Sequence, residues 1–247
     1  EVGGIVGQNF GGFVMGCYNR SYVGGAGSSI GGIVGQNFGG VIGCGNSGTV
    51  YGESRYIGGV VGMNTSNGTD PAATEATVFQ CCNTGSVIRD NDTSEAAIGG
   101  VVGASIDGTV FHCYNAGSVS NKGFVSGGVV GSADRGNVEN CHNVGNVSAK
   151  AYAGPIVGRV YNNPTVKNCY YLSDTETDSL DGTTAKSAAV FASGELVALL
   201  NESDTFAGTY WQQTVGTDAY PKFSGICDHI PGEAVRENEK PATCTED

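Results

Sequence analysis

The sequence predicts an all-β fold: a right-handed parallel β-helix (β-solenoid) of about six coils, with a small C-terminal cap that contains a helix. Three observations predict it: an excess of glycine, a repeat of 27–28 residues, and columns of identical residues inside that repeat. Glycine accounts for 42 of 247 residues, but with only 6 prolines and no Gly-X-Y period the chain is not collagen-like. Hydrophobic residues make up 39% of the chain, which is enough for a packed core.

The repeat is marked by the string Gly-Gly-(Ile/Val)-Val-Gly. It begins at Gly3, Gly31, Gly58, Gly99 and Gly127, and a variant with proline as its second residue begins at Gly154. Successive starts are separated by 28, 27, 41, 28 and 27 residues. A repeat of this length suits one full coil of a solenoid, in which each coil needs its neighbours to bury its apolar face. A β-propeller is the alternative fold, but its blades need about 40 residues and four strands.

Cysteine, valine and asparagine keep a fixed spacing within each repeat. A valine precedes each cysteine by three residues. An asparagine follows each of the first five cysteines by two residues, and Tyr171 takes this position after the sixth. The column consists of Cys17, Cys44, Cys81, Cys113, Cys141 and Cys169. Coils stack about 4.8 Å apart, so each residue should lie on its own kind in the next coil. We expect three short β runs in each coil, with the asparagines forming a ladder at a turn.

The pattern Gly-Gly-Val-Val-Gly followed by Gly-x-Val-x-x-Cys-Tyr-Asn-x-Gly-x-Val, as it stands at 99–119, resembles the GLUG-motif repeat family. The resemblance covers residues 3–172, about 70% of the chain. Such repeats occur in bacterial surface and secreted proteins, including Gram-positive ones and non-catalytic parts of IgA-peptidase-like proteins. The resemblance implies an extracellular, adhesive role and supplies no catalytic residues.

Charge divides the chain near residue 172. Residues 1–172 hold 10 acidic and 8 basic residues, whereas 173–247 hold 14 acidic and 4 basic residues. We expect 1–172 to be the solenoid and 173–224 to be a capping segment over its open end, with a helix at 187–201 that Ser187 caps and Gly194 could split. Residues 225–247 resemble the truncated start of a further cysteine-rich module and are expected to be flexible.

The third coil is longer than the others. Two polar insertions leave it, near Asn64–Glu75 and Arg89–Ala97. Insertions in solenoids emerge as loops and often form a binding face. We therefore expect both to protrude while the coils on either side keep their register, with Val61 beside Val102.

One column of residues is a candidate ligand-binding surface. The position after each cysteine holds Tyr18, Gly45, Cys82, Tyr114, His142 and Tyr170. If the cysteines point inward, this column points outward, and exposed aromatic rings can stack on sugars or anchor a protein partner. The candidate ligand-binding residues are Tyr18, Tyr114, His142 and Tyr170, although such a column is also typical of ordinary half-exposed β-structure.

The six column cysteines are expected to be free, buried thiols. In a parallel stack their Cβ vectors run side by side, too far apart for an unstrained disulfide. Cys227 and Cys244 alone look able to pair, or with His229 they could form half of a zinc site. His112 and His142 flank the column at −1 and +1, and we expect them on opposite faces of the strand.

An acidic segment is the one candidate metal site. Asp174, Glu176, Asp178 and Asp181 place carboxylates at nearly alternate positions before Gly182, a spacing that could hold Ca²⁺. The spacing does not match an EF-hand loop, and a solvated acidic connector is the alternative. No other cofactor is expected.

These features favour a non-catalytic segment of a bacterial cell-surface or secreted protein, acting as an adhesin or spacer. We expect a monomer that binds a host surface protein or a glycan. The net charge of −12 disfavours nucleic-acid partners, and no apolar run is long enough to span a membrane. The alternative is a carbohydrate-active β-helix enzyme of the polysaccharide lyase or hydrolase type, which would need clustered acidic and basic residues on one face. Ice binding would need a threonine array, and none is present.

Overall fold

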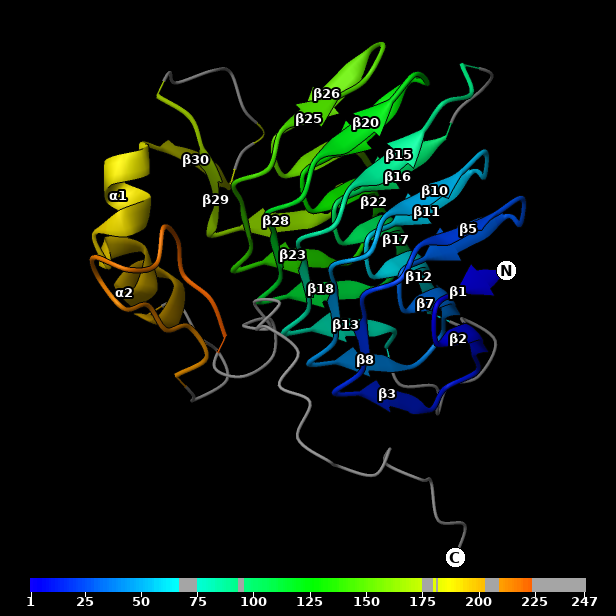
Figure 1. The fold of residues 1–247 in the computed structure, drawn as a ribbon, viewed down its shortest axis with the longest axis horizontal. Helices are drawn as coiled ribbons and strands as arrows, with labels where there is room; N and C mark the ends of the chain where they lie inside the picture. The colour runs from blue at the N-terminus through cyan, green and yellow to red at the C-terminus, as the bar shows by residue number, and fades with distance from the viewer. Residues whose placement is uncertain (67–74, 93–95, 175–179, 181, 203–208, 224–247) are drawn as a thin grey trace, which may run out of the picture.

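The computed structural model describes residues 1–66, 75–92, 96–174, 180, 182–202 and 209–223. Its main part is a β-solenoid of about six coils, in which short parallel strands stack side by side (Figure 1). Each full coil contributes five strands, one to each of five parallel sheets, instead of the three runs expected from the sequence.

Sheets A and B contain the Gly-Gly-(Ile/Val)-Val-Gly repeats. Sheet A precedes the central bend of this string and sheet B follows it. In order, sheet A consists of β1 (Val2–Gly3), β6 (Ser29–Gly31), β11 (Tyr56–Gly58), β16 (Ala97–Gly99), β21 (Val125–Gly127) and β26 (Tyr152–Gly154). Sheet B consists of β2 (Val6–Asn9), β7 (Val34–Asn37), β12 (Val61–Thr65), β17 (Val102–Ile106), β22 (Val130–Asp134) and β27 (Val157–Tyr161).

Sheets C and D flank the cysteine column. Sheet C consists of β3 (Phe13–Met15), β8 (Gly40–Ile42), β13 (Thr77–Phe79), β18 (Thr109–Phe111), β23 (Asn137–Glu139) and β28 (Thr165–Lys167). Sheet D consists of β4 (Tyr18–Asn19), β9 (Gly45–Asn46), β14 (Cys82–Asn83), β19 (Tyr114–Asn115), β24 (His142–Asn143), β29 (Cys169–Leu172) and β30 (Thr183–Lys186). Sheet E closes each coil with β5 (Val23–Gly25), β10 (Val50–Gly52), β15 (Val87–Arg89), β20 (Val119–Asn121) and β25 (Val147–Ser148).

A turn before each cysteine explains why one expected run is two strands. The residue before the cysteine adopts a left-handed backbone conformation in every coil, with φ between 48° and 62°. These residues are Gly16, Gly43, Gln80, His112, Asn140 and Asn168. Glycine and asparagine tolerate this conformation best, and the bend divides the Val-x-x-Cys-Tyr run into strands of sheets C and D.

The columns read from the sequence stack in register. Val61 pairs with Val102, so the coils on either side of the long third coil stay aligned as predicted. Asn46, Asn83, Asn115 and their equivalents form a buried ladder in which each side-chain amide donates to the next side-chain oxygen at 2.7–2.8 Å. The first insertion begins and ends in polar residues, and the second begins at Arg89 and ends at the buried Ala96 and Ala97. The rest of each insertion lies outside the described residues.

Two apolar cores fill the solenoid. The larger one lies inside sheets B, C and D and contains the valine and cysteine columns, for example Val61, Val78 and Cys81. The smaller one lies between sheets A and E and contains Ile57, Val87 and their equivalents. Both consist of stacked, nearly identical side chains, as expected for coils that bury each other's apolar faces.

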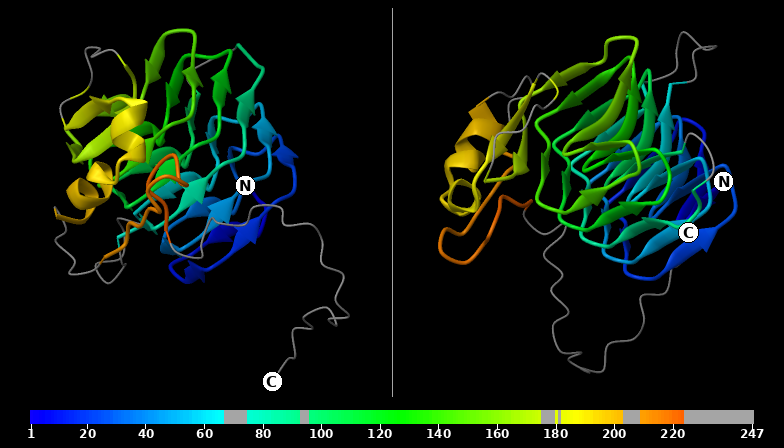
Figure 2. Two further views of the ribbon diagram at one scale, coloured as in Figure 1. Left: turned by 60° about the vertical axis from the view of Figure 1, so that its left-hand side comes forward. Right: turned by 90° about the horizontal axis from the view of Figure 1, so that it is seen from above.

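The C-terminal segment only partly matches the expected cap. Strand β30 pairs with β29, and Leu180 and Ala185 pack against the larger core. Helices α1 (Ala188–Ala192) and α2 (Glu195–Glu202) lie beside the stack, against sheet D (Figures 1 and 2). The expectation that residues 173–224 as a whole cover the open end is therefore wrong for the helices.

The helical prediction itself is close. Ser187 caps α1 by accepting a hydrogen bond from the backbone N–H of Val190, and Gly194, at φ +87°, separates α1 from α2. Among the described helices, none has the length and apolar composition needed to cross a membrane. Residues 225–247, including Cys227, His229 and Cys244, lie outside the described residues.

Candidate functional site

The predicted aromatic column points away from the larger core but is not an exposed binding surface. Tyr114, His142 and Tyr170 are 1%, 0% and 8% exposed, and Tyr18 is half-buried. Phe191, Leu196, Leu200, Trp211 and Phe223 of the C-terminal segment cover the column and form a third apolar core with it. The prediction of exposure is wrong because the sequence shows which side of a strand faces outward but not what packs on that side.

His112 and His142 lie on the same side of the stack, against Trp211, and not on opposite faces. That expectation was wrong because positions −1 and +1 are two residues apart, and alternation along a strand places such positions on one face. His112 also adopts a left-handed backbone conformation at the bend before the cysteine. The Trp211 indole N–H donates to Nδ1 of His112 at 3.0 Å. His142 Nε2 lies 2.9 Å from the carbonyl oxygen of Pro221, to which it donates as Nε2–H.

Burial lowers the pKa of His142 to about 4, below its ordinary value of 6.5, although the bond to Pro221 acts in the opposite direction. The imidazole is therefore neutral at physiological pH. Its ring stacks on Tyr114 with 5.1 Å between ring centroids. The two histidines thus hold the C-terminal segment on sheet D.

The cysteine column contains free thiols, as predicted. Cys44, Cys81, Cys113, Cys141 and Cys169 are buried, and Cys17 in the first coil is half-buried. Burial raises the pKa of the Cys141 and Cys169 thiols. Cys82 is disulfide-bonded, which the sequence analysis did not predict. The expected pairing of Cys227 with Cys244 lies outside the described residues.

The calcium prediction is mostly outside the described residues. Asp174 is exposed, whereas Glu176, Asp178 and Asp181 lie in the undescribed part of the chain. Within the described part, no group of three or more His, Cys, Asp or Glu side chains is placed to hold a metal ion.

A groove that the sequence analysis missed lies between sheets A and B. Its volume is about 520 Å³, within the usual range for ligand sites. We call it the A–B groove, and its main side chains are Tyr56 on β11, Phe124 before β21, Tyr152 on β26, Asp134 on β22, and Arg159 and Tyr161 on β27. Phe124, Tyr152 and Tyr161 are 39%, 47% and 40% exposed. Exposed aromatic rings at this density are typical of a binding surface.

The glycines of the repeat bring the two sheets together beside the groove. A Cβ atom on Gly131 would lie 2.4 Å from the carbonyl oxygen of Gly103 and 2.6 Å from the amide nitrogen of Ile98. A Cβ atom on Gly99 would lie 1.9 Å from the carbonyl oxygen of Val102. Only glycine allows backbones to approach this closely, so the repeat motif builds the corner from which the groove opens.

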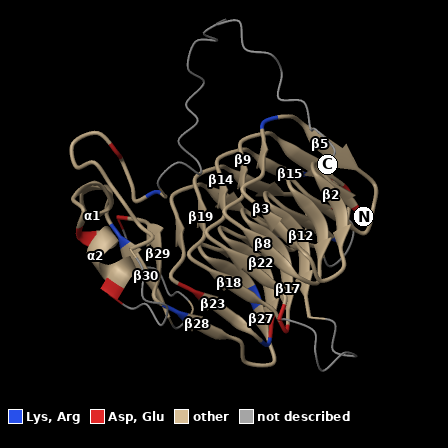
Figure 3. Cartoon of the chain, turned by 90° about the horizontal axis from the view of Figure 1, so that it is seen from below, with Lys and Arg blue, Asp and Glu red and all other residues tan. Residues whose placement is uncertain are grey.

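Cationic side chains cover the aromatic rings of the groove. The Arg159 guanidinium lies 4.9 Å from the ring centroids of both Tyr152 and Tyr161. Arg55 lies 5.2 Å from the ring of Tyr56. Such cation–π contacts orient the guanidinium and the ring relative to each other. Most of the stacked strands carry no charged side chains (Figure 3). These arginines are therefore among the few charges on a weakly charged surface.

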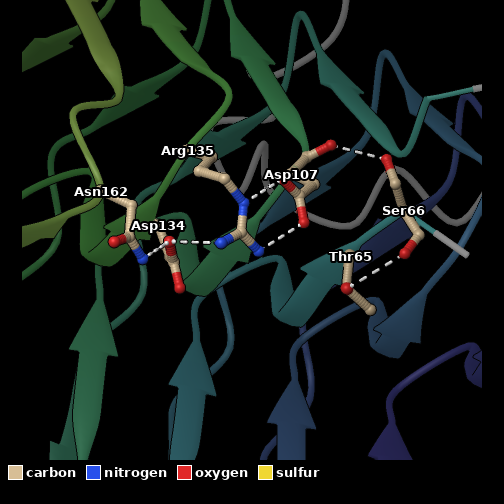
Figure 4. Close-up of polar contacts among 6 residues, drawn as sticks. All are labelled: Thr65, Ser66, Asp107, Asp134, Arg135 and Asn162. Atoms are coloured by element: carbon tan, nitrogen blue, oxygen red, sulfur yellow. Dashed lines mark hydrogen bonds and ion pairs between the residues drawn. The ribbon is translucent and has the colours of Figure 1, made fainter. Parts of the chain in front are cut away.

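Asp134 belongs to a polar network at the edge of the groove (Figure 4). Its Oδ1 accepts a hydrogen bond from Asn162 Nδ2 at 2.7 Å and lies 3.5 Å from Arg135 Nη1. Arg135 also binds Asp107 in a bidentate pair, and its hydrogen bond lowers the pKa of Asp107. The carboxylate of Asp134 is therefore already matched by protein groups.

A signal for the groove was present in the sequence. Tyr56, Ala97, Val125 and Tyr152 stand two residues before the first glycine of the string in successive repeats, and they pair in register in sheet A. Ala96 and Ala97, at the end of the second insertion, also line the groove. This column varies in residue type, so a search for identical residues does not find it.

Comparisons of the chain with protein-family models, with curated proteins and with solved structures found no match.

Proposed function

We propose that this chain is a non-catalytic, ligand-binding segment of a bacterial surface or secreted protein, an adhesin whose A–B groove binds a glycan. The observation that carries the proposal is the row of aromatic side chains along one groove, in which Phe124, Tyr152 and Tyr161 are exposed and Tyr56 is half-buried. Sugar rings bind by stacking their C–H faces on aromatic side chains. Such a site needs few groups besides these rings and some hydrogen-bonding partners.

The groove's charges favour binding over catalysis. Glycoside hydrolysis uses two carboxyl groups about 5–9.5 Å apart, one on each side of the scissile bond. Among the described lining residues Asp134 is the single carboxylate, and it is paired with Asn162 and Arg135. A carboxyl group that protein donors already bind is poorly placed to transfer a proton to a leaving group. The carbohydrate-active enzyme therefore remains the second reading, without a specific observation in its favour.

The extracellular location rests on the resemblance of the repeats to the GLUG-motif family. A weakly charged solenoid with a long, continuous flank also suits a protein that displays a binding surface away from a cell. A host surface protein is the other ligand class that the sequence suggests.

A glycan array tests the proposal, followed by incubation of each bound polysaccharide with the protein and measurement of reducing ends. We expect binding to at least one glycan and no release of product. The variant Tyr152→Ala should lose that binding, whereas Tyr22→Ala, which removes a 65% exposed tyrosine outside the groove, should keep it. Turnover of any polysaccharide, or binding only to a host protein, would contradict the proposal.

A further inference from the structure

We propose that the A–B groove selects acidic glycans, with Arg159 pairing to the carboxylate of a uronic or sialic acid while Tyr152 and Tyr161 contact its ring. This inference rests on the proposed function and adds the class of ligand.

The guanidinium of Arg159 is oriented by its neighbours and has no carboxylate partner among the described residues. Its guanidinium sits 4.9 Å from two tyrosine ring centroids, which restrict its orientation, and its side chain is half-buried. Within the described part of the chain, no carboxylate lies within ion-pair distance of Arg159 or Arg55. Their N–H groups are therefore available to a ligand. Rings that pre-order an arginine reduce the entropy lost when it forms hydrogen bonds.

The neighbouring charges strengthen this preference. Asp134, the carboxylate that lines the groove, is matched by Asn162 and Arg135. Lys150 lies over Phe124 but is 3.8 Å from Asp92, so it adds little net charge. Arg55 and Arg159 remain as an uncompensated positive pair on a chain whose formal net charge is −12. The solenoid as a whole is weakly charged, with 10 acidic and 8 basic residues in 1–172, so these arginines make the groove a local site of attraction for an anionic ligand.

The combination of rings and arginine favours an acidic sugar over a simple anion. A guanidinium presents two parallel N–H groups that match the two oxygens of a carboxylate. Each tyrosine ring has one face toward the Arg159 guanidinium and a second flat, apolar face, which an inorganic anion cannot use but a pyranose ring can. One site therefore contains both parts of a uronic acid's recognition chemistry, its ring face and its carboxylate.

The groove is long enough for an oligosaccharide. Tyr56 and Tyr152 belong to the same column of sheet A and are three coils apart. At about 4.8 Å per coil, this separation is about 14 Å along the solenoid axis. A chain ligand would thus lie across the strands, with its acidic sugar at Arg159 and further rings extending toward Tyr56.

The experiment measures the affinity of the protein for oligogalacturonate, hyaluronan oligosaccharides and sialyllactose, each against its carboxyl-reduced counterpart. Reduction replaces the carboxylate by a neutral alcohol and keeps the ring. We expect at least one acidic glycan to bind at least tenfold more tightly than its reduced form. Arg159→Gln should remove most of this difference, and Arg159→Lys should restore only part of it because lysine lacks the planar fork.

Arg20→Gln is the matched control. Arg20 also lies over a tyrosine ring, 5.3 Å from the centroid of Tyr18, but outside the groove. Its replacement should leave the affinity unchanged. Equal binding of acidic and reduced glycans, with no effect of Arg159→Gln, would overturn the inference and leave glycan binding intact. If no glycan on the array or in these pairs binds, both the inference and the proposed function are overturned.

Discussion

Each buried asparagine of the ladder in sheet D satisfies several hydrogen-bonding groups at once. Asn115 donates to the side-chain oxygen of Asn143 and to the carbonyl of Gly117, both at 2.8 Å, and accepts from Asn83 at 2.8 Å. Buried amides are stable only when their donors and acceptors are matched, and a repeated asparagine supplies its own partner in the next coil. A polar column can therefore occur inside the apolar stack.

His142 makes the attachment of the C-terminal segment sensitive to pH. Its folded pKa of about 4 lies below the ordinary value of 6.5, so only the unfolded or detached form binds a proton between these values. Stability from this group is complete above pH 6.5 and falls as the pH drops toward 4. With about 1.4 kcal/mol per pKa unit, the loss by pH 4 is about 3 kcal/mol.

Fluorescence of Trp211, the one tryptophan of the chain, measures this effect during urea unfolding at several pH values. Trp211 is fully buried and its ring centroid lies 5.0 Å from that of His142, so its emission should shift to the red when the segment detaches. His142→Phe keeps an aromatic ring at this position but removes the titrating imidazole. Its unfolding free energy should therefore fall less between pH 6.5 and 4 than that of the unmodified protein. Parallel pH profiles for the two proteins would contradict this account.

At the scale of the elements, the glycines of the repeat decide how closely sheets A and B approach. Gly7 and Gly131 both end the Gly-Gly-(Ile/Val)-Val-Gly string, but their surroundings differ. A Cβ atom on Gly131 would meet a backbone atom at 2.4 Å, whereas on Gly7 in the first coil the nearest atom would be 3.6 Å away. In this column the requirement for glycine thus comes from the adjacent coil, whereas at Gly99 it comes from the carbonyl oxygen of Val102 in the same turn.

Gly131→Ala should destabilise the protein by about 3 kcal/mol or more, since a clash with rigid backbone cannot be relieved by a side-chain rotation. Gly7→Ala should change stability by no more than about 0.5 kcal/mol. Chemical denaturation of both variants measures the difference. Similar stabilities for the two variants would show that the corner is less tightly packed than the distances indicate.

The elements also show what the sequence could predict. Repeated Val, Cys and Asn columns predicted the stacking register, because each residue contacts its equivalent in the next coil. The split at Gly194 and the cap at Ser187 follow from local backbone chemistry. Two strands in place of one at the cysteine were missed, because the residue at the bend varies between Gly, Gln, His and Asn and so forms no column of identical residues. Gln80 in addition adopts a left-handed conformation that its residue type disfavours.

At the scale of the whole molecule, the unpredicted features are contacts that occur once. Trp211 packs on the column of Tyr114 and His142, although it lies up to about a hundred residues further along the sequence. No repeated pattern in the sequence indicates this contact. The same packing converts the predicted binding column into a core. The A–B groove was missed for a related reason: Arg159 and Tyr161 of the sixth coil complete a surface that begins with Tyr56 in the third.

The central claim is that the A–B groove binds a glycan without cleaving it, and hydrogen exchange tests this most directly. The protein is labelled with and without the tightest glycan from the array, and the glycan's length is measured in the same sample. We expect added protection in β26 and β27, around Tyr152 and Arg159, and a glycan of unchanged length. Protection confined to other sheets, or a shortened glycan, would contradict the claim.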